Sequence, residues 1–335
     1  MTLRVGVIGT GMIGRDHIRR LTRVVSGAEV VAVSDANEQV AKEVASGLPD
    51  ATVHVSGEDL IGDERVDAVL VCSWGPTHEA YVLASIAAGK AVFCEKPLAT
   101  TREACRKILD AESAHGSRLV QVGFMRRYDE SYRALKDVID SGRIGAPLIY
   151  FSSHRNPSVP EHYTKDMAIV DTAVHDFDVT RWLLGEELAA IRVVAAKANS
   201  LGKDLQDPLL MILETASGVL VNVETSVNIR YGYDIRGEVV GETGTAALAD
   251  RGLVVLRTGN QVGVAVPEDW RQRFIAAYDV EFQEWVNAVA SGEGATGPSA
   301  WDGYAAQVVC DAGVEALYSG DRVEIDLGVK PALYG

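Results

Sequence analysis

Cysteine is scarce in this sequence, with 4 residues among 335, and no two of them have the CxxC spacing of a zinc or redox site. Cys72 and Cys94 lie inside apolar runs, where a reduced cysteine acts as a small hydrophobic side chain. No basic segment followed by an apolar one opens the chain, and no apolar run approaches the ~20 residues that a membrane-spanning helix needs. We therefore expect a cytoplasmic protein that does not enter a membrane.

Basic residues are also in the minority, with 32 Lys and Arg against 47 Asp and Glu, a formal charge of −15. No run of Lys and Arg breaks this excess of negative charge. Such a surface repels DNA, RNA and anionic lipids, so we expect no nucleic-acid partner. The chain is long for one hydrophobic core and suits two domains.

The first 124 residues alternate between short apolar runs and longer stretches with helical spacing. Strands that are apolar throughout are typical of a parallel sheet covered by helices on both faces. Strand–helix alternation predicts βαβ units in a doubly wound parallel sheet. We therefore predict an α/β Rossmann domain over residues 1–124, with strands at Leu3–Ile8, Val30–Ser34, Ala68–Cys72, Ala91–Cys94 and Leu119–Val122.

From residue 125 the pattern changes. A helical segment, Glu130–Ser141, is followed by β-rich runs between Ile191 and Leu256, separated by turn signals such as Asp250-Arg251-Gly252. Two amphipathic helices, Trp270–Ala290 and Ala300–Tyr318, follow them. We predict an α+β domain over residues 125–335 with an open, mainly antiparallel sheet.

A glycine-rich loop follows the first predicted strand. Gly9, Gly11 and Gly14 form a GxGxxG pattern between that strand and a helical stretch. In such a loop the first glycine permits the turn, the second lets a pyrophosphate approach the backbone, and the third packs helix against strand. The N–H groups at the helix start, including those of Met12 and Ile13, hold the phosphates.

The second predicted strand leads into Asp35, 21 residues after Gly14. A carboxylate at this distance accepts hydrogen bonds from the adenosine ribose of a dinucleotide. Ala36 and Asn37 follow it, so no Arg is present to bind a 2′-phosphate, and the carboxylate repels one. The pattern predicts NAD rather than NADP. The alternative is a glycine-rich turn beside an unrelated acidic residue.

Two further strands end in polar residues, at the sheet edge where doubly wound folds bind ligands. A lysine beside a cofactor site can hydrogen-bond a substrate hydroxyl and stabilise developing negative charge, although most lysines are solvated surface charges. We assign Lys96 to both cofactor and substrate. The remaining cofactor candidates are Ser73, Trp74, His78 and Glu95.

Asp171 and His175 lie four residues apart, which places both on one face if the segment is helical. Histidine suits the base that oxidation of an alcohol requires, because its pKa lies near neutrality. Asp171 beside it orients the ring or accepts a substrate hydroxyl. The alternatives are an N-cap role for Asp171 and a buried, hydrogen-bonded structural role for His175.

Two polar clusters suit a ligand with many hydroxyls, or are ordinary polar loops. One lies at a strand end and contains His154 and Asn156, and the other contains Tyr233. The acidic run after His175 suggests a metal site with His154 or His162 as an alternative. It has neither an HExxH nor a paired-cysteine pattern, and hydride transfer to NAD needs no metal. We expect no metal.

These motifs together resemble the glucose–fructose oxidoreductase, inositol dehydrogenase and rhizopine-catabolism family (Gfo/Idh/MocA). The EKP motif at Glu95–Pro97 and the DxxxH motif at Asp171–His175 are its hallmarks, and longer segments are similar to its bacterial inositol dehydrogenases. These are SWGPTHE (73–79), FCEKPLATT (93–101), VQVGFMRRYD (120–129), HRNPSV (154–159), DMAIVDTAVHDFDV (166–179), YGYDIRGEVVGE (231–242) and GPSAWDGY (297–304).

The resemblance implies an NAD-dependent oxidation of myo-inositol to its 2-keto product. It implies that Lys96, Asp171 and His175 form the catalytic set, with His175 as the proton acceptor. It places His154, Asn156 and Tyr233 near the substrate hydroxyls, and it implies a homotetramer formed through the open sheets. The alternatives are scyllo-inositol, D-chiro-inositol or a glucose-like sugar as substrate, and a non-catalytic regulator that senses NAD and a sugar.

Overall fold

The computed structural model describes residues 2–202, 205–249 and 254–335. The predicted turn at residues 250–252 lies outside them. The chain divides into two compact units. The first unit contains residues 1–124, 278–307 and 327–335, and the second contains residues 125–277 and 308–326.

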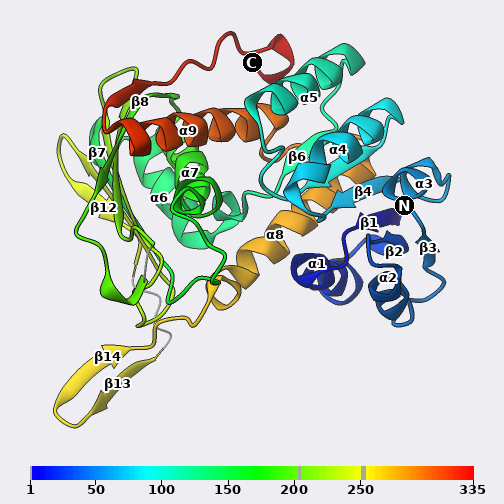
Figure 1. Ribbon diagram of the computed structural model, residues 1–335, viewed down its shortest axis with the longest axis horizontal. Coiled ribbons are helices and arrows are strands. Elements are labelled where there is room, and N and C mark those ends of the chain that lie inside the picture. Colours follow the sequence, from blue (N-terminus) through cyan, green and yellow to red (C-terminus); the bar gives the residue numbers. More distant parts are fainter. Residues whose placement is uncertain (1, 203–204, 250–253) are drawn as a thin grey trace. The chain divides into compact units, whose positions relative to one another are not determined.

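The first unit contains a sheet of six parallel strands in the order β3-β2-β1-β4-β5-β6 (Figure 1). This order confirms the predicted doubly wound parallel sheet. The strand Thr52–His54 was not predicted, because its three half-buried residues give no apolar run. The bounds are β1 (Leu3–Ile8), β2 (Ala28–Ser34), β3 (Thr52–His54), β4 (Ala68–Val71), β5 (Ala91–Cys94) and β6 (Val120–Val122).

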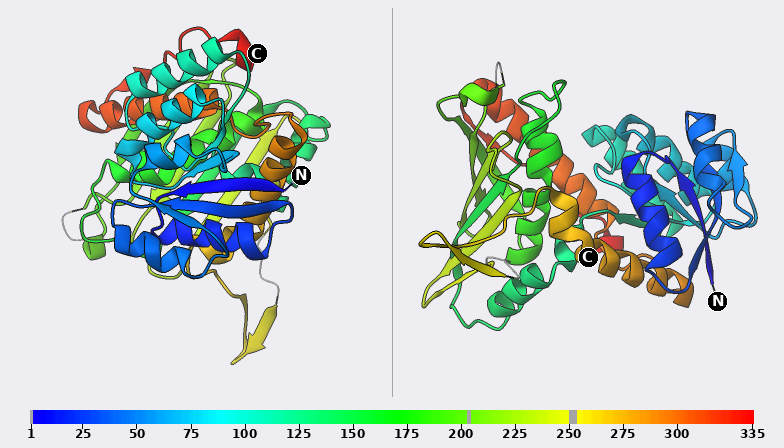
Figure 2. Two further views of the ribbon diagram at one scale, coloured as in Figure 1. Left: turned by 90° about the vertical axis from the view of Figure 1, so that its right-hand side faces the viewer. Right: turned by 90° about the horizontal axis from the view of Figure 1, so that it is seen from below.

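Helices connect these strands, and local side chains set where several of them begin. Asn37, Ser56 and Thr101 each accept a hydrogen bond from a backbone N–H in the first turn of their helix. The central strands β4 and β5 are buried at every residue, so helices cover both faces of the sheet (Figure 2). The helices are α1 (Met12–Arg23), α2 (Glu38–Ala45), α3 (Gly57–Gly62), α4 (His78–Ala87) and α5 (Arg102–His115), with short 3-10 turns at Gly75–Thr77 and Ala332–Tyr334.

The second unit contains a seven-stranded sheet in the order β12-β11-β7-β10-β9-β8-β15. Among the strands that the structure describes in this sheet, β7 and β10 alone pair in parallel, and the other neighbours are antiparallel. The predicted, mainly antiparallel sheet is confirmed. Its strands are β7 (Pro147–Arg155), β8 (Leu188–Ala195), β9 (Leu209–Thr215), β10 (Leu220–Ser226), β11 (Asp234–Gly241), β12 (Thr245–Ala247) and β15 (Arg322–Glu324), with a separate hairpin of β13 (Val255–Thr258) and β14 (Gln261–Val264).

One face of this sheet is covered by helices, and within the described residues the other face carries none (Figure 2). Buried and more exposed residues alternate along β9, β10 and β11, as expected for a sheet with one covered face. The covering segments include α6 (Glu130–Asp140), a π-helical segment (Ala168–Ala173) and α7 (Val174–Leu184). Short 3-10 turns lie at Met125–Tyr128 and Ser200–Gly202.

The two predicted long helices are present as α8 (Trp270–Ser291) and α9 (Ala300–Ser319). Residues 278–291 of α8 contribute Phe282 and Trp285 to the core of the first unit, where they join Phe93 of β5. No described helix is both long and apolar enough to cross a membrane.

Candidate active site

The loop between β1 and α1 has a geometry that requires glycine. Gly9 has a φ of +92°, and a Cβ there would lie 2.5 Å from the backbone of Cys72. A Cβ on Gly14 would lie 2.0 Å from the carbonyl oxygen of Gly9, so α1 packs directly on the loop. Apart from Gly11 itself and its two chain neighbours, no described atom lies within 4 Å of the position a Cβ would take at Gly11. The backbone there is open to a phosphate.

The start of α1 suits an anion. Its N-cap is Gly11, which has no side chain to cap the helix, and no acidic residue lies in the first turn, which includes the exposed Met12 and the half-buried Ile13. The first N–H groups and the positive end of the helix dipole therefore face outward without a capping carboxylate.

Asp35 follows β2 directly, beside the glycine loop. Its Oδ2 accepts a hydrogen bond from the backbone N–H of Thr10 at 2.7 Å, and its Oδ1 accepts one from that of Asn37 at 2.9 Å. Carboxylate oxygens have further lone pairs for ribose hydroxyls. The open backbone at Gly11, the uncapped helix and this fixed carboxylate fit an NAD molecule.

The ends of β4 and β5 are tied together by His78. Its buried imidazole has Nδ1 2.7 Å from the carbonyl oxygen of Pro97 and Nε2 2.9 Å from that of Ser73. The Ser73 hydroxyl lies 2.7 Å from that of Thr77, while Trp74 is 78% exposed. These bonds make His78 a support for the loop, and its predicted contact with the cofactor stays a prediction.

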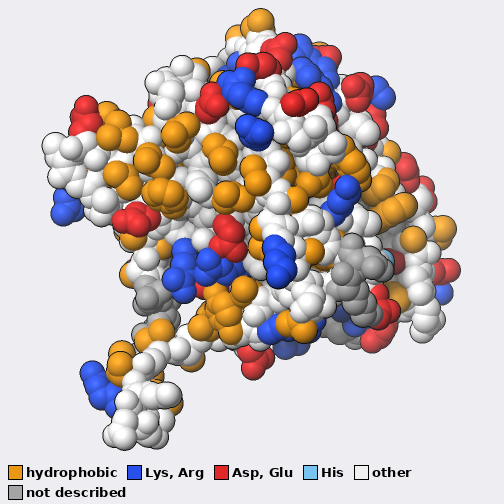
Figure 3. Space-filling model, turned by 60° about the vertical axis from the view of Figure 1, so that its left-hand side comes forward, with side chains coloured by type: hydrophobic (Ala, Val, Ile, Leu, Met, Phe, Trp, Pro, Cys, Tyr) orange, Lys and Arg blue, Asp and Glu red, His pale blue; other side chains and the backbone are white. Residues whose placement is uncertain are grey.

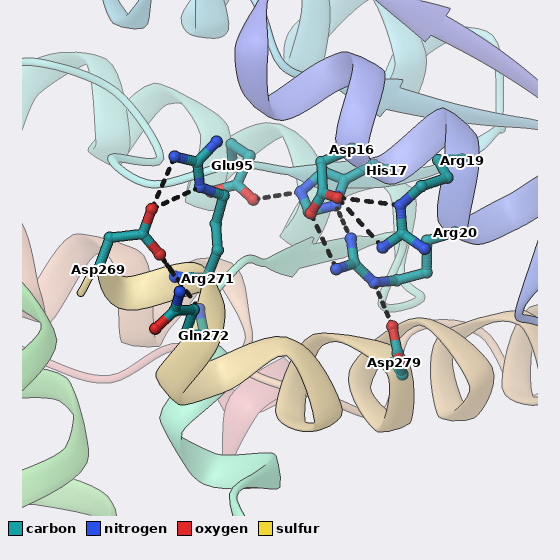
Figure 4. A network of polar contacts seen from close by, with 9 residues as sticks. All are labelled: Asp16, His17, Arg19, Arg20, Glu95, Asp269, Arg271, Gln272 and Asp279. Carbon is teal, nitrogen blue, oxygen red and sulfur yellow. Dashed lines mark hydrogen bonds and ion pairs between the residues drawn. The ribbon is translucent and has the colours of Figure 1, made fainter. Parts of the chain in front are cut away.

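Glu95 points into the first unit. Its Oε1 lies 2.6 Å from Nε2 of His17, on α1 (Figure 4). Its Oε2 accepts the backbone N–H of Lys96 at 3.2 Å. Lys96 itself is half-buried at the end of β5. The carboxylate therefore organises the turn that carries Lys96, and a direct contact of Glu95 with the cofactor stays a prediction.

In the second unit, three of the predicted substrate residues lie together. His154, near the end of β7, has its ring centroid 6.5 Å from that of His175, in the first turn of α7. The hydroxyl of Tyr233, next to β11, lies 3.2 Å from Nε2 of His154. Asn156 follows β7, where its backbone bonds to Ser226 and Ile229.

Asp171 does not cap a helix, so that alternative is wrong. It lies inside the π-helical segment Ala168–Ala173, which runs directly into α7, and the N-cap of α7 is Ala173 without a side-chain hydrogen bond. Asp171 is exposed whereas His175 is buried. π-helical turns are rare in proteins, and those that occur within α-helices are often found at functional sites.

A buried ion pair supports this cluster, and sequence reasoning missed it. Nη1 of Arg126 lies 2.6 Å from Oδ1 of Asp176, with both side chains buried. Oδ2 of Asp176 lies 2.8 Å from Nδ1 of His154, and Oδ1 accepts the hydroxyl of Ser152 at 2.7 Å. Arg126 and Asp176 are 50 positions apart, so no local pattern indicates their contact.

The pair keeps its charges despite its burial. Burial alone would raise the pKa of the Asp176 carboxyl, but the charge of Arg126 and the hydrogen bonds from His154 and Arg126 hold that pKa well below its usual range. The carboxylate in turn raises the pKa of Arg126 against the effect of burial. Burial also raises the pKa of the Tyr233 hydroxyl, so this group remains a hydrogen-bond donor.

The acidic run after His175 is engaged in ion pairs. Asp176 binds Arg126, and Asp178 binds Arg127. Among the described residues, no group of three or more His, Cys, Asp or Glu is arranged to hold a metal ion.

Comparisons with known proteins find similar proteins over the whole length of the chain. The model of an oxidoreductase family with an NAD-binding Rossmann fold matches residues 3–124, and that of the family's C-terminal alpha/beta domain matches residues 136–325. Inositol 2-dehydrogenase 3 of Saccharopolyspora erythraea is 56% identical over 100% of this chain and 99% of its own. Inositol 2-dehydrogenase of Pseudomonas fluorescens is 55% identical over 100% of both chains. Among solved structures, myo-inositol dehydrogenase from Lactobacillus casei, crystallised with NAD(H) and myo-inositol, has a TM-score of 0.98 and 42% identity over 100% of both chains.

Proposed function

This chain belongs to the Gfo/Idh/MocA oxidoreductase family, and from that premise we propose that it oxidises myo-inositol at C2 to the 2-keto product, with NAD as cofactor. The observation that carries the proposal is the full-length similarity to inositol 2-dehydrogenases, 55% and 56% identical, in a chain with a glycine loop that fits NAD. We assign the reaction to the cytoplasm.

Three side chains carry the chemistry in this proposal. His175 accepts the proton of the substrate hydroxyl, because neutral imidazole is a base near neutral pH. Lys96 stabilises the negative charge that develops on that oxygen. Asp171 orients the imidazole or accepts a neighbouring hydroxyl. Bound NAD supplies the hydride acceptor.

The second unit supplies groups suited to a ring with several hydroxyls. His154, Asn156 and Tyr233 offer both donors and acceptors. The buried pair of Arg126 and Asp176 fixes the imidazole of His154 through Nδ1, which leaves Nε2 toward Tyr233. A site built from fixed hydrogen-bonding groups selects against ligands that leave those groups unpaired.

We assign a homotetramer to the enzyme, formed through the open face of the seven-stranded sheet. Phe151, Ile212 and Leu220 are 43%, 37% and 45% exposed on that face, where hydrophobic side chains gather (Figure 3). Asn222 of β10 pairs with both Phe151 and Ile212, so the two side chains lie on the same face. An exposed apolar patch of this kind marks an interface.

Two ion pairs lie on the same face. Arg155 lies 2.5 Å from Glu224, and Arg322 lies 2.8 Å from Glu214. Because these four charges are paired, they add little like-charge repulsion when two copies of the face meet.

The experiment that tests the function is a panel of inositol stereoisomers and aldoses, each assayed with NAD and with NADP at alkaline pH. We expect NADH formation with myo-inositol at the highest kcat/KM. A higher kcat/KM with scyllo-inositol, D-chiro-inositol or glucose would identify that compound, in place of myo-inositol, as the substrate. Absence of NADH with every polyol would favour a regulator that binds NAD and a sugar without turnover.

A further inference from the structure

A chain of buried polar side chains joins helix α1 to the turn that carries Lys96. Nε2 of His17 lies 2.6 Å from Oε1 of Glu95, and Nδ1 of His17 lies 2.7 Å from Nη1 of Arg20 (Figure 4). The side chains of His17 and Arg20 are fully buried. A buried polar chain is costly unless every member is satisfied, so its presence calls for a physical reason.

The chemistry of the three groups fixes the position of the proton. The guanidinium of Arg20 has only donors, so Nδ1 of His17 must be the acceptor of that bond. Nε2 then carries the proton and donates a hydrogen bond to Glu95. Burial lowers the pKa of His17, and the hydrogen bond to Glu95 offsets only part of this effect, so the ring is neutral at neutral pH. The two hydrogen bonds are therefore donated in one direction, from Arg20 to His17 and from His17 to Glu95.

Arg20, at the end of this row of side chains away from Lys96, is held by residues of two helices. Nε of Arg20 donates to Asp279 of α8 at 2.6 Å, and Nη2 donates to Asp16 of α1 at 2.9 Å (Figure 4). The guanidinium also lies 5.1 Å from the ring centroid of Tyr278. The imidazole of His17 packs against Phe282, with their ring centroids 4.4 Å apart and their planes tilted by 36°. His17 thus has little freedom to move.

The near end acts on the turn after β5. One carboxylate oxygen of Glu95 is held by His17, and the other accepts the N–H of Lys96. A Cβ on Gly123 would lie 3.1 Å from that second oxygen, so the carboxylate also fits closely against the end of β6. The position of Glu95 therefore sets the backbone at Lys96.

We infer that His17 is a positioning residue: acting through Glu95, it holds the backbone of Lys96 in place for the proposed oxidation. The inference rests on the proposed function for its kinetic consequence only. A shift of ~1 Å in a catalytic group costs roughly 10²-fold in rate, so a support with little freedom has a measurable effect. A merely structural His17 would contribute to stability without acting on Lys96.

Two substitutions separate these roles. His17→Gln keeps an amide nitrogen that donates to Glu95 and an oxygen that accepts from Arg20, whereas His17→Leu removes both. We expect His17→Leu to lower kcat by about 10- to 100-fold with an unchanged dissociation constant for NAD, measured by fluorescence quenching. His17→Gln should restore most of the turnover. The isotope effect on kcat with substrate deuterated at C2 should rise in His17→Leu, because hydride transfer becomes more rate-limiting.

Hydrogen exchange gives a readout that does not depend on the substrate. The amide of Lys96 should exchange faster in His17→Leu than in His17→Gln or wild type, because its acceptor is no longer held. The matched control is the same pair of substitutions at His54, the last residue of β3. Its Nε2 lies 3.0 Å from Oδ2 of Asp63, so this histidine also contacts a carboxylate. We expect neither change at His54 to alter the isotope effect or the exchange at Lys96.

The outcomes are distinct. A wild-type protein without turnover would contradict the proposed function and leave the exchange measurement to decide the role of His17. The positioning role would be overturned by a His17→Leu protein with a lower melting temperature but normal kcat, isotope effect and exchange at Lys96. It would also be overturned if His17→Gln were as slow as His17→Leu.

Discussion

Asp176 contacts Arg126 through a 2.6 Å ion pair between two side chains that are 0% and 1% exposed. The same carboxylate bonds to His154, so the pair connects the covering helix α7 to the end of β7. Replacing one member of a buried pair leaves the other charge without compensation. The pair therefore links the stability of the second unit to the geometry of its polar cluster.

The first prediction concerns this pair. Asp176→Asn should lower the free energy of unfolding by about 3–5 kcal/mol, because it leaves Arg126 buried without an opposite charge. Arg126→Met should have a similar effect, and the double variant should lose less than the sum. Urea unfolding at one protein concentration measures all three. Losses below 1 kcal/mol in both single variants would contradict the role.

The pair also predicts how stability depends on pH. The folded-state pKa of Asp176 is depressed, so its contribution to stability is fully present above the ordinary pKa of a carboxyl group. It is lost as the pH falls through that range toward the folded pKa. In Asp176→Asn the decline of stability on acidification should therefore be smaller than in wild type. Equal losses of stability on acidification in the two proteins would show that other carboxyl groups determine the pH dependence of stability.

How much of this fold the sequence predicts depends on the range of each interaction. The strands β4 and β5 are apolar and buried throughout, because this parallel sheet is covered on both faces, and local sequence predicts them. The strand Thr52–His54 was missed because its residues are half-buried. The return of residues 278–307 to the first unit depends on contacts such as that of Trp285 with Phe93, which no local pattern reveals.

The same distinction applies to the site. Glycine-loop geometry is local, so Gly9, Gly11 and Gly14 were found from their spacing. The hydrogen-bond partners of His154 and Glu95 are distant from them in sequence. The residue types of His154 and Glu95 alone therefore do not show which side chains they contact. The π-turn that contains Asp171 is also not predictable from the sequence, because the spacing of its residues does not differ from that of an ordinary helix.

The second prediction concerns the choice of cofactor. Asp35→Ser should remove the repulsion toward a 2′-phosphate and reduce the preference for NAD over NADP by ~10-fold, or about 1.4 kcal/mol. Because Asp35 also holds Thr10, Asp35→Asn is the control that keeps an acceptor for that N–H while it removes the charge. Steady-state kcat/KM with each cofactor measures the preference. A wild-type enzyme that used NADP as well as NAD would contradict the ribose role.

The third prediction concerns assembly. Wild type should sediment as a homotetramer at micromolar concentration, and Phe151→Glu or Ile212→Glu should dissociate it, because each places a charge in the proposed interface. Val55→Glu is the matched control, since Val55 is 80% exposed and lies in the first unit. A monomeric wild type, or variants that remain tetrameric, would argue against this face.

The last prediction tests the proton acceptor. His175→Ala should lower kcat by ~10²–10⁴-fold, the usual contribution of a general base. The dissociation constant for NAD should change little, because the glycine loop and Asp35 belong to the first unit and His175 to the second. His115→Ala is the control, because His115 is exposed at the end of α5. Lys96→Ala should also depress kcat.

The pH dependence of the rate completes the argument for His175. Only a neutral imidazole accepts a proton, so kcat of the wild type should rise with pH as the histidine loses its proton. In His175→Ala this rise should disappear from the residual rate. Asp171→Asn should keep the rise and lose less activity if Asp171 only orients the ring. A folded His175→Ala enzyme with near-normal kcat would move the role of proton acceptor to Lys96 or Asp171, and the pH profile of the corresponding variant would then identify which of the two it is.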